Sequence, residues 1–449
     1  MGLTGIQIFK LMPKTNCGEC GVPTCLAFAM NLASGKAELD KCPYVSAEAK
    51  EKLAAESAPP IRPVTVGTGE YAVKVGGETV LFRHEKTFVN PPGLAVMVST
   101  AEEGASVDGK IDRFKKAQYD RVGLKLRAEM IAVKDAGGGA DAFCALAAKA
   151  AATGAAMIFM SDSADVLTAA ADKFKDKKPL LYAATAANVE AVGNLAKASE
   201  CPVAVKGDGT LESVIALSEK LTAMGVKDII IDTGTRELKK AFSEQIMIRR
   251  SALKDRFRPL GFPTIILANE MGDGIMEEAL VAATFIAKYG ALMVMSDLQP
   301  HVLFPLLLAR LNIYTDPQRP MTAEQGIYPI NNPDENSPVL VTCNFSLTYF
   351  IVSGEVEGSR VPSWLLVQDT EGLSVMTAWA AGKFSGESVG TFINKCGIKD
   401  KIKHKTVIIP GYAAGISGEL EEELGAGWTV QVGPREASQI PKFLKSFKA

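Results

Sequence analysis

The sequence predicts an α/β protein with three parts: a small cysteine-rich N-terminal domain, a central (β/α)8 barrel of the TIM type, and a small doubly wound C-terminal domain. Three observations carry this prediction. Four of the eight cysteines lie within the first 42 residues, eight short apolar runs recur between about 93 and 300, and a compact strand–helix alternation follows a proline-rich segment. A chain of 449 residues is long enough for several hydrophobic cores.

The composition argues against several classes of partner. The 49 basic and 51 acidic residues give a formal net charge of −2, so no excess of positive charge favours nucleic acid or an anionic membrane. No apolar run is long enough to span a bilayer, and residues 1–6 lack the basic start of a secretory signal. We therefore expect a cytoplasmic location, where clustered cysteines indicate metal binding more than disulfides.

Residues 1–57 are expected to form a cluster domain around Cys17, Cys20, Cys25 and Cys42, which follow the spacing C-x2-C-x4-C-x16-C. Glycine and proline between the cysteines let the backbone wrap closely around a metal centre. Structural zinc sites usually pair two C-x2-C units or add histidine, and the first histidine here is His84. The pattern favours a [4Fe-4S] cluster, with zinc as the open alternative.

Two short helices are expected beside these cysteines. Residues 6–12 form an apolar stretch that ends at a proline, and residues 22–34 have helical spacing, with Leu26 and Met30 on one face and Gly35 as a natural stop.

A proline-rich linker at 58–63 comes next, and residues 71–83 then alternate around Gly76 and Gly77. This alternation predicts a hairpin with arms at 71–75 and 78–82.

The central part, 58–325 with its linker and hairpin, is predicted to contain eight buried parallel strands, because such strands give unalternating apolar runs. Eight strand–helix units in this length favour a closed barrel, and an open sheet is the main alternative. The predicted strands are 94–98, 130–133, 157–160, 180–183, 203–205, 229–231, 264–268 and 292–295.

Polar residues end several of these strands, where a barrel enzyme would place its catalytic groups. The same residue types cap the helices that follow, and we favour capping about two to one over catalysis. If the barrel were itself an enzyme, its pocket would hold Asp232, Asn269 and Asp297. The complete set is Ser161, Asp162, Asp208, Asp232, Thr233, Asn269, Glu270, Ser296 and Asp297.

Residues 312–338 contain five prolines and are expected to be a loop-like boundary. Beyond it, 326–449 is predicted to be a doubly wound domain with strands at 339–342, 364–368, 406–409 and 428–432. Ligands of such sheets bind beyond the carboxyl ends of the strands. The loops there, together with the start of the first helix, supply the candidate ligand contacts: Thr342, Asn344, Ser346, Thr348, Thr370, Gly372, Leu373, Ser374, Gly411, Tyr412, Ala413, Ala414, Gly433 and Pro434.

The whole chain resembles the corrinoid/iron–sulfur protein family of the acetyl-CoA (Wood–Ljungdahl) pathway, chiefly through the text Asn16-Cys17-Gly-Glu-Cys20-Gly and its cysteine spacing. The resemblance implies a [4Fe-4S] cluster on the four cysteines and a corrinoid held by the C-terminal domain. It also implies a heterodimer with a smaller subunit, and two further partners. A separate methyltransferase supplies methyl from methyltetrahydrofolate to Co(I), and acetyl-CoA synthase receives it.

Many cobalamin domains place a histidine below the cobalt through an Asp-x-His-x-x-Gly motif, which this sequence lacks. Its histidines are His84, His301 and His404, and none fits that pattern. The absence of this donor would ease reduction to Co(I), because axial donors favour the higher oxidation states. A low-potential electron donor, acting through the cluster, would then restore Co(I) after accidental oxidation. The family role is that of a methyl carrier more than of a stand-alone catalyst, with 312–338 as a hinge.

Two other functions stay open on the sequence. The barrel could be a pterin-dependent methyltransferase in its own right, or the chain could be an iron–sulfur electron carrier without corrinoid. Visible spectra distinguish these alternatives, because a corrinoid has bands that change on reduction and methylation.

Overall fold

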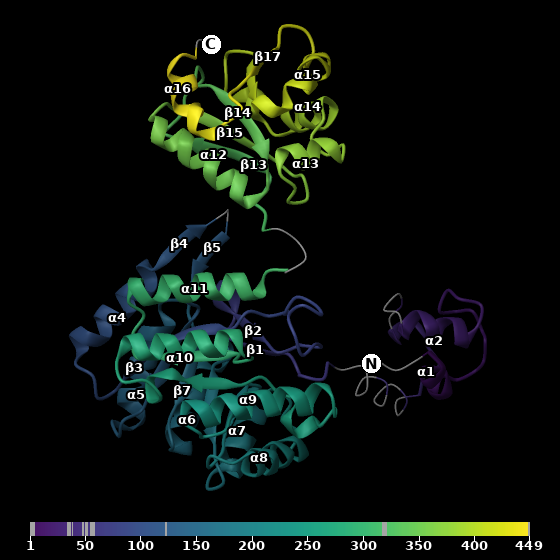
Figure 1. Ribbon diagram of the computed structural model, residues 1–449. Coiled ribbons are helices and arrows are strands. Elements are labelled where there is room, and N and C mark those ends of the chain that lie inside the picture. Colours follow the sequence, from purple (N-terminus) through teal and green to yellow (C-terminus); the bar gives the residue numbers. More distant parts are fainter. Residues whose placement is uncertain are drawn as a thin grey trace. The chain divides into compact units, whose positions relative to one another are not determined.

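A computed structural model describes residues 5–33, 37, 39–46, 49, 53, 59–121, 124–316 and 321–447 (Figure 1). The expected helix stop at Gly35, the first linker residue Ala58, and Pro317 and Pro320 of the expected hinge lie outside these residues. The chain divides into two compact units. The first is 1–81, 89–107 and 129–297, and the second is 82–88, 108–128 and 298–449.

The N-terminal segment of the first unit contains both short helices that the sequence predicts. Helix α1 (Gly5–Leu11) ends before Pro13, and α2 (Cys25–Ala33) begins at a cysteine; a 3-10 turn, η1 (Leu39–Lys41), follows. The residues of α2 that are buried are Cys25, Phe28 and Ala29, whereas Leu26 and Met30 are exposed. The helix therefore turns its cysteine face, not its Leu26 and Met30 face, toward the apolar cluster of this segment.

The hairpin predicted around Gly76 and Gly77 is wrong in its pairing. Strand β2 (Val73–Val75) pairs antiparallel with β1 (Val64–Val66), which precedes it, and 78–82 is not a strand. Both glycines have positive φ, and the Gly77 N–H donates to the Ile61 carbonyl, so the chain leaves the sheet there.

The residue that follows this bend, Glu78, is buried. It accepts a hydrogen bond from the Val89 N–H and pairs with Arg249 at 3.5 Å. Burial raises the pKa of Glu78, and the Arg249 charge opposes that rise. Side-chain contacts of Glu78, and not a ladder of backbone hydrogen bonds, thus hold the start of the predicted second arm.

All eight predicted barrel strands are confirmed, and the barrel is closed. The parallel order is β10-β9-β8-β7-β6-β3-β12-β11, and the Ile231 N–H donates to the Pro263 carbonyl at 2.8 Å, which joins the last strand to the first. The strands are β3 (Gly93–Ser99), β6 (Met130–Lys134), β7 (Ala156–Met160), β8 (Leu180–Ala184), β9 (Val203–Lys206), β10 (Ile229–Asp232), β11 (Ile265–Leu267) and β12 (Leu292–Met295).

A helix follows each of these strands in the chain. Three begin with a side-chain cap: Ser163 accepts from the Val166 N–H, Thr210 from the Ser213 N–H, and Glu237 from the Lys239 and Lys240 N–H groups. An additional hairpin, β4 (Gln118–Arg121) with β5 (Leu124–Arg127), precedes β6 and belongs to the second unit. The helices are α4 (Gly104–Lys116), α5 (Gly139–Ala151), α6 (Ala164–Phe174), α7 (Val189–Ser199), α8 (Leu211–Ala223), α9 (Leu238–Leu253), α10 (Ile275–Ala287) and α11 (Pro300–Tyr314).

The second unit contains a five-stranded sheet in the order β13-β15-β14-β16-β17. The four predicted strands are present as β14 (Val339–Cys343), β15 (Ser363–Gln368), β16 (Thr406–Ile409) and β17 (Thr429–Val432). The interpretation of 312–338 as loop is wrong at its start and in its middle. Helix α11 continues to Tyr314, and β13 (Gly326–Ile330) is an antiparallel edge strand whose Pro329 a central strand would not accept.

Helices cover both faces of this sheet. The core on one face includes residues of α13 (Val375–Ala380), α14 (Gly386–Lys395) and α15 (Ser417–Leu424). The core on the other includes residues of α12 (Ser346–Ser359) and α16 (Ile440–Lys445). The chain passes from β14 to β15 on one side and then to β16 on the other, so the strand order reverses at β14. A crevice beyond the carboxyl ends of β14 and β16 is the expected ligand site.

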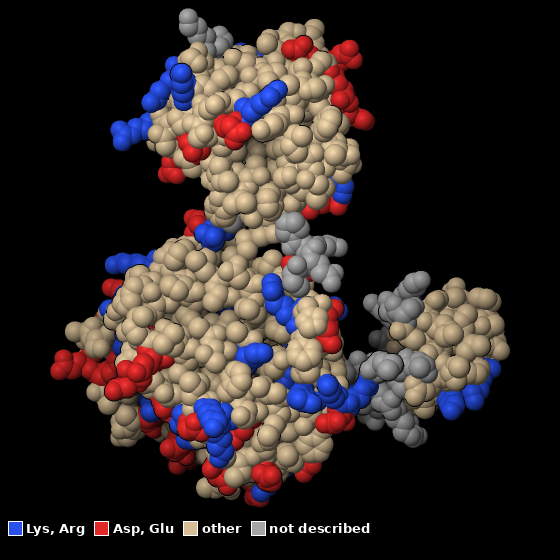
Figure 2. Space-filling view, in the orientation of Figure 1, with Lys and Arg blue, Asp and Glu red and all other residues tan. Residues whose placement is uncertain are grey.

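In the part of the chain that the structure describes, no helix has the length and apolar character that a membrane crossing requires. Figure 2 shows basic and acidic side chains intermixed along the lower part of the barrel, consistent with the near-zero net charge.

Candidate functional site

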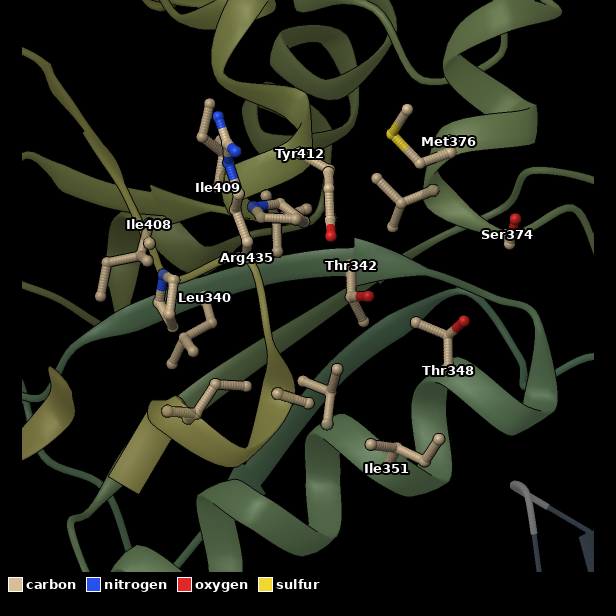
Figure 3. A pocket seen from close by; sticks show the side chains of 18 residues that line it. Leu340, Thr342, Thr348, Ile351, Ser374, Met376, Ile408, Ile409, Tyr412 and Arg435 are labelled. Atoms are coloured by element: carbon tan, nitrogen blue, oxygen red, sulfur yellow. The ribbon is translucent and has the colours of Figure 1, made fainter. Parts of the chain in front are cut away.

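A cavity of about 280 Å³ lies at the carboxyl edge of the second unit's sheet, at the point where the strand order reverses. Figure 3 shows the Tyr412 side chain pointing toward Thr342, and Thr348 and Ile351 projecting from α12. The lining comes from strands β14 and β16, from helices α12, α13 and α16, and from the loops between them. The lining residues are Leu340, Val341, Thr342, Thr348, Ile351, Val352, Ser374, Val375, Met376, Ile408, Ile409, Pro410, Tyr412, Gly433, Pro434, Arg435, Ala437 and Ile440.

One buried hydroxyl in this cavity has no hydrogen-bond partner among the described residues. Thr342 is 1% exposed, and its Oγ1 makes no hydrogen bond. A buried polar atom without a partner costs about 1–3 kcal/mol, so natural proteins rarely keep one without a function. Its position at the end of β14, among apolar side chains, suits a bound group that brings its own hydrogen-bonding amides.

Two glycines let the loops after β16 and β17 meet behind the cavity. A Cβ on Gly411 would lie 2.6 Å from the Gly433 carbonyl oxygen, and a Cβ on Gly433 would lie 2.9 Å from that of Ile409. Both distances are too short for a real side chain. The two loops therefore approach each other at backbone contact distance, and no side chain from either glycine fills the cavity.

Six of the fourteen candidate contact residues line the cavity: Thr342, Thr348, Ser374, Tyr412, Gly433 and Pro434. The structure places the other eight elsewhere. Ser346 begins α12, Gly411 and Ala413 are buried, and Ala414 is exposed on the same turn.

The remaining four, Asn344, Thr370, Gly372 and Leu373, form one hydrogen-bonded unit. Asn344 Oδ1 accepts from the N–H groups of Thr370 and Gly372, and also from the Thr370 hydroxyl at 2.9 Å. The Leu373 carbonyl oxygen lies 2.8 Å from the same hydroxyl, whose single hydrogen the two acceptors share. This unit joins the loops that follow β14 and β15.

Sequence reasoning found Thr348 on α12 but missed the next turn of that wall, because it searched the strand-end loops and only the start of the first helix. Thr348, Ile351 and Val352 follow i, i+3, i+4 spacing on α12, which was a usable signal of one inward face. The further lining residues that were not predicted include Met376, Arg435, Ala437 and Ile440.

Five large apolar side chains on α12, α13 and the loop after β16 are exposed, and three of them line the cavity. Leu347, Ile351, Met376, Trp379 and Tyr412 are between 45% and 57% exposed. Exposed apolar patches of this kind mark ligand or protein contacts.

The cavity lining includes no histidine. His404, which lies in this unit, is engaged elsewhere. Its Nε2 is 2.9 Å from the Ser337 carbonyl oxygen, and its Nδ1 accepts the Thr406 N–H at 3.2 Å. The ring therefore holds the start of β16 and not a ligand.

The four N-terminal cysteines differ in burial. Cys25 and Cys42 are buried in the apolar cluster of this segment, Cys20 packs against it, and Cys17 is exposed. All four are free thiols. Among the described residues no three histidine, cysteine or acidic side chains lie close enough to hold one metal ion.

Asn16 nevertheless holds the cysteine loop against Cys25 through two contacts. The Asn16 N–H points to Cys25 Sγ at 3.4 Å, and Asn16 Oδ1 accepts the Cys25 N–H at 2.8 Å. Asn16, Gly18 and Gly21 have positive φ, which curls the loop. Hydrogen bonds to sulfur and a cysteine at a helix start both suit a thiolate-held iron–sulfur cluster.

The strand ends of the barrel are occupied by an internal network. Asp232, which is 3% exposed, pairs with Arg236 and accepts a hydrogen bond from the Tyr182 hydroxyl at 2.5 Å. Arg236 also binds Glu270 at 2.6 Å, and Lys134 lies 3.6 Å from Glu270. Burial, and then the Asp232 charge, raises the pKa of Tyr182 well above its usual value.

Other polar strand ends serve the fold in the same way. The Ser161 hydroxyl donates to Asp135 and accepts the Ser163 N–H, and Asp208 accepts from Thr210. Asn269 donates to Met97 Sδ, while its buried Oδ1 has no partner. Internal contacts thus engage Ser161, Asp208 and Asn269, whereas the helix caps predicted from the sequence fall at the neighbouring residues Ser163 and Thr210.

Two family models match the chain. Residues 63–444 match the family described as "CO dehydrogenase/acetyl-CoA synthase delta subunit", and residues 12–44 match one described as "Putative Fe-S cluster". The second range contains all four clustered cysteines.

Curated relatives match over nearly the full length. The chain is 47% identical over 448 residues to the corrinoid/iron-sulfur protein large subunit of Moorella thermoacetica, covering 99% of each chain. It is 34% identical to the acetyl-CoA decarbonylase/synthase complex subunit gamma of Methanothermobacter thermautotrophicus, again over 99% of each. Dihydropteroate synthase from Thermus thermophilus aligns with 57% of this chain and 100% of its own, at 12% identity and a TM-score of 0.41. The barrel assignment rests on the strand pairing instead.

Proposed function

Because this chain belongs to the CO dehydrogenase/acetyl-CoA synthase delta subunit family and its full-length relatives include a corrinoid/iron-sulfur protein large subunit, we propose that it is a corrinoid methyl carrier. It carries iron–sulfur and corrinoid cofactors and works as one subunit of a larger complex. The observation that supports the role best is the joint presence of a match to an iron–sulfur family at 12–44 and a cavity at the switch point of the C-terminal sheet.

The C-terminal cavity is the proposed corrinoid site. When bound, the corrinoid supplies a cobalt that accepts and releases a methyl group. Thr342 Oγ1 offers an unused hydrogen-bonding atom. Gly411 and Gly433 let the loops after β16 and β17 approach closely without a side chain between them. The exposed rim residues, such as Met376 and Tyr412, provide apolar contact for a flat macrocycle. With no histidine in the lining, we propose that no protein imidazole lies below the cobalt.

Ten of the fourteen contacts predicted from the sequence divide into two proposed roles. The six that line the cavity touch the cofactor, and the Asn344–Thr370 unit holds the loops that carry them.

The N-terminal cysteines are the proposed ligands of a [4Fe-4S] cluster. Zinc has no redox chemistry, whereas an iron–sulfur cluster passes single electrons at low potential. The exposed Cys17 gives an electron donor an approach, and the buried Cys25 and Cys42 shield the other side.

The proposed domains are 1–57 for the cluster, 58–325 for the linker, hairpin and barrel, and 326–449 for the corrinoid. The proposed partners are a smaller subunit, a methyltetrahydrofolate methyltransferase, acetyl-CoA synthase and a low-potential electron donor. A carrier must present one cofactor face to more than one protein, so the C-terminal domain is proposed to move about the stretch between Tyr314 and Gly326.

Anaerobic purification followed by metal analysis tests the function directly. We expect iron and cobalt together, and absorption bands that change on reduction and on addition of a methyltransferase with methyltetrahydrofolate. A preparation without cobalt that also fails to bind added corrinoid would refute the carrier role. Iron alone would support the electron-carrier alternative, and methyl transfer from the folate by the chain alone would support a barrel enzyme.

A further inference from the structure

The cavity at the carboxyl edge of the second unit's sheet contains a single charged residue. Among its lining residues, all of which the structure describes, Arg435 is the one that carries a charge. The other members are apolar side chains, glycine, three hydroxyl residues and Tyr412. Arg435 is itself an exposed residue, so its guanidinium stays hydrated in the empty protein and is accessible to an anionic group of a ligand.

Arg435 also has no carboxylate partner within the described residues. Its guanidinium lies over the Tyr412 ring, 5.9 Å from the centroid, and the Tyr412 hydroxyl donates to Glu436 at 3.1 Å. The neighbouring carboxylate is thus engaged by the tyrosine, and the ring supports the guanidinium from one side. An arginine held in this way is prepared for an oxyanion, which it can bind through two parallel hydrogen bonds.

The proposed cofactor has one group that matches. A complete corrinoid carries neutral amides around its ring, and its one permanent peripheral anion is the phosphodiester that joins the nucleotide to the macrocycle. The truncated corrinoid cobinamide keeps the ring, the cobalt and the amides but lacks this phosphodiester. A single cation in the cavity lining can therefore pair with the phosphodiester of a complete corrinoid, and it has no such partner in cobinamide.

On the basis of the proposed function, we infer that Arg435 binds the phosphodiester of the corrinoid nucleotide loop and makes the site selective for complete corrinoids over cobinamide. The loop between β17 and α16 then receives the nucleotide end of the cofactor. The hydroxyl-bearing side of the cavity, with Thr348 and Ser374, is left for the ring amides.

Binding titrations of the full chain, prepared anaerobically without corrinoid, test this assignment. The ligands are hydroxocobalamin and cobinamide, and the proteins are wild type, Arg435→Met, Arg435→Lys and Lys442→Met. Lys442 is an exposed cation on α16 that does not line the cavity, so its variant is the matched control for charge. We expect Arg435→Met to weaken cobalamin binding about tenfold, as loss of a charged hydrogen bond does, and to change cobinamide binding less than twofold. Arg435→Lys should recover part of the loss.

Equal losses for both ligands, or no loss for either, would overturn the role of Arg435 while leaving the carrier function intact. Failure of the wild type to bind either ligand would instead contradict the proposed function. If Arg435→Met does not fold, the wild type still provides a test. Its cobalamin affinity should fall more steeply between 50 and 500 mM salt than its cobinamide affinity, because the phosphate contact is screened. Equal salt dependence would refute the assignment.

Discussion

Arg236 forms a bidentate ion pair with Asp232, in which Nη1 lies 3.0 Å from Oδ1 and Nη2 lies 2.9 Å from Oδ2. Asp232 is one of the three residues that a barrel enzyme would need in its pocket. Its two oxygens are already used by Arg236, Tyr182 and the Gly234 N–H. The carboxylate therefore stabilises the barrel, and this argues against its use as a catalytic group.

Replacing Asp232 by Asn should destabilise the barrel without affecting corrinoid binding. We expect a loss of about 2 kcal/mol, less than for a fully buried pair because Arg236 is partly exposed and keeps Glu270. Urea unfolding followed by circular dichroism measures it. The control Asp228→Asn breaks an exposed pair with Arg62 and should cost about 0.5 kcal/mol or less. Loss of methyl acceptance in Asp232→Asn at unchanged stability would revive the barrel enzyme.

Tyr182→Phe should change the alkaline stability of the protein. Burial and the Asp232 charge hold the pKa of Tyr182 well above 10 in the folded state, whereas the unfolded chain ionises it near 10. Wild-type stability is therefore lost as pH rises above about 10, by up to about 1.4 kcal/mol per pH unit from this group. The phenylalanine variant lacks this contribution, so the wild-type advantage should be constant from pH 7 to 9 and shrink above 10. A difference that stays constant to pH 11 contradicts the assignment.

Cys20→Ala should remove the electron relay and spare the corrinoid. We expect lower iron content, normal corrinoid binding and no reductive reactivation by a low-potential donor. Iron analysis and corrinoid spectra follow these separately. Cys396→Ala, at a cysteine of the second unit outside the cluster motif, is the control and should keep all three properties. Normal reactivation in Cys20→Ala would disprove the role of the cluster.

Thr342→Val should weaken corrinoid binding severalfold and leave the corrinoid-free protein as stable as before. The buried Oγ1 has no partner in the protein, so its removal costs the empty protein no hydrogen bond. Titration with hydroxocobalamin gives the affinity, and thermal unfolding gives the stability. If stability falls and affinity does not, the hydroxyl serves the fold and not the ligand.

Gly411→Ala should damage the cavity through the backbone. The new methyl group would lie 2.6 Å from the Gly433 carbonyl oxygen, so the loops after β16 and β17 must separate. We expect at least a tenfold weaker corrinoid affinity together with a lower melting temperature. Gly415→Ala is the control in the same turn, where a Cβ meets nothing within 4 Å. Equal behaviour of the two variants would show that the close approach is not needed.

The elements that the sequence predicted well are those whose burial is visible as a pattern of neighbouring residues. The eight barrel strands were found because both of their faces are buried, so their apolar runs do not alternate. The cysteine spacing is likewise visible in a short stretch of the sequence.

The features that were missed depend on contacts distant in the sequence. Nothing in 326–330 says that an edge strand will accept Pro329, and the pairing of 73–75 with 64–66 was decided by the bend at Gly76 and Gly77. The position of Arg435 in the cavity also follows from the strand order and not from its neighbours.

One consequence concerns biosynthesis. Leu340 and Ile440 are walls of the same cavity, although they stand near opposite ends of the C-terminal domain. A nascent chain that has been synthesised only as far as β15 lacks the cavity walls that β16 and α16 supply. If the corrinoid binds in this cavity as proposed, we expect its insertion to follow synthesis of the whole C-terminal domain.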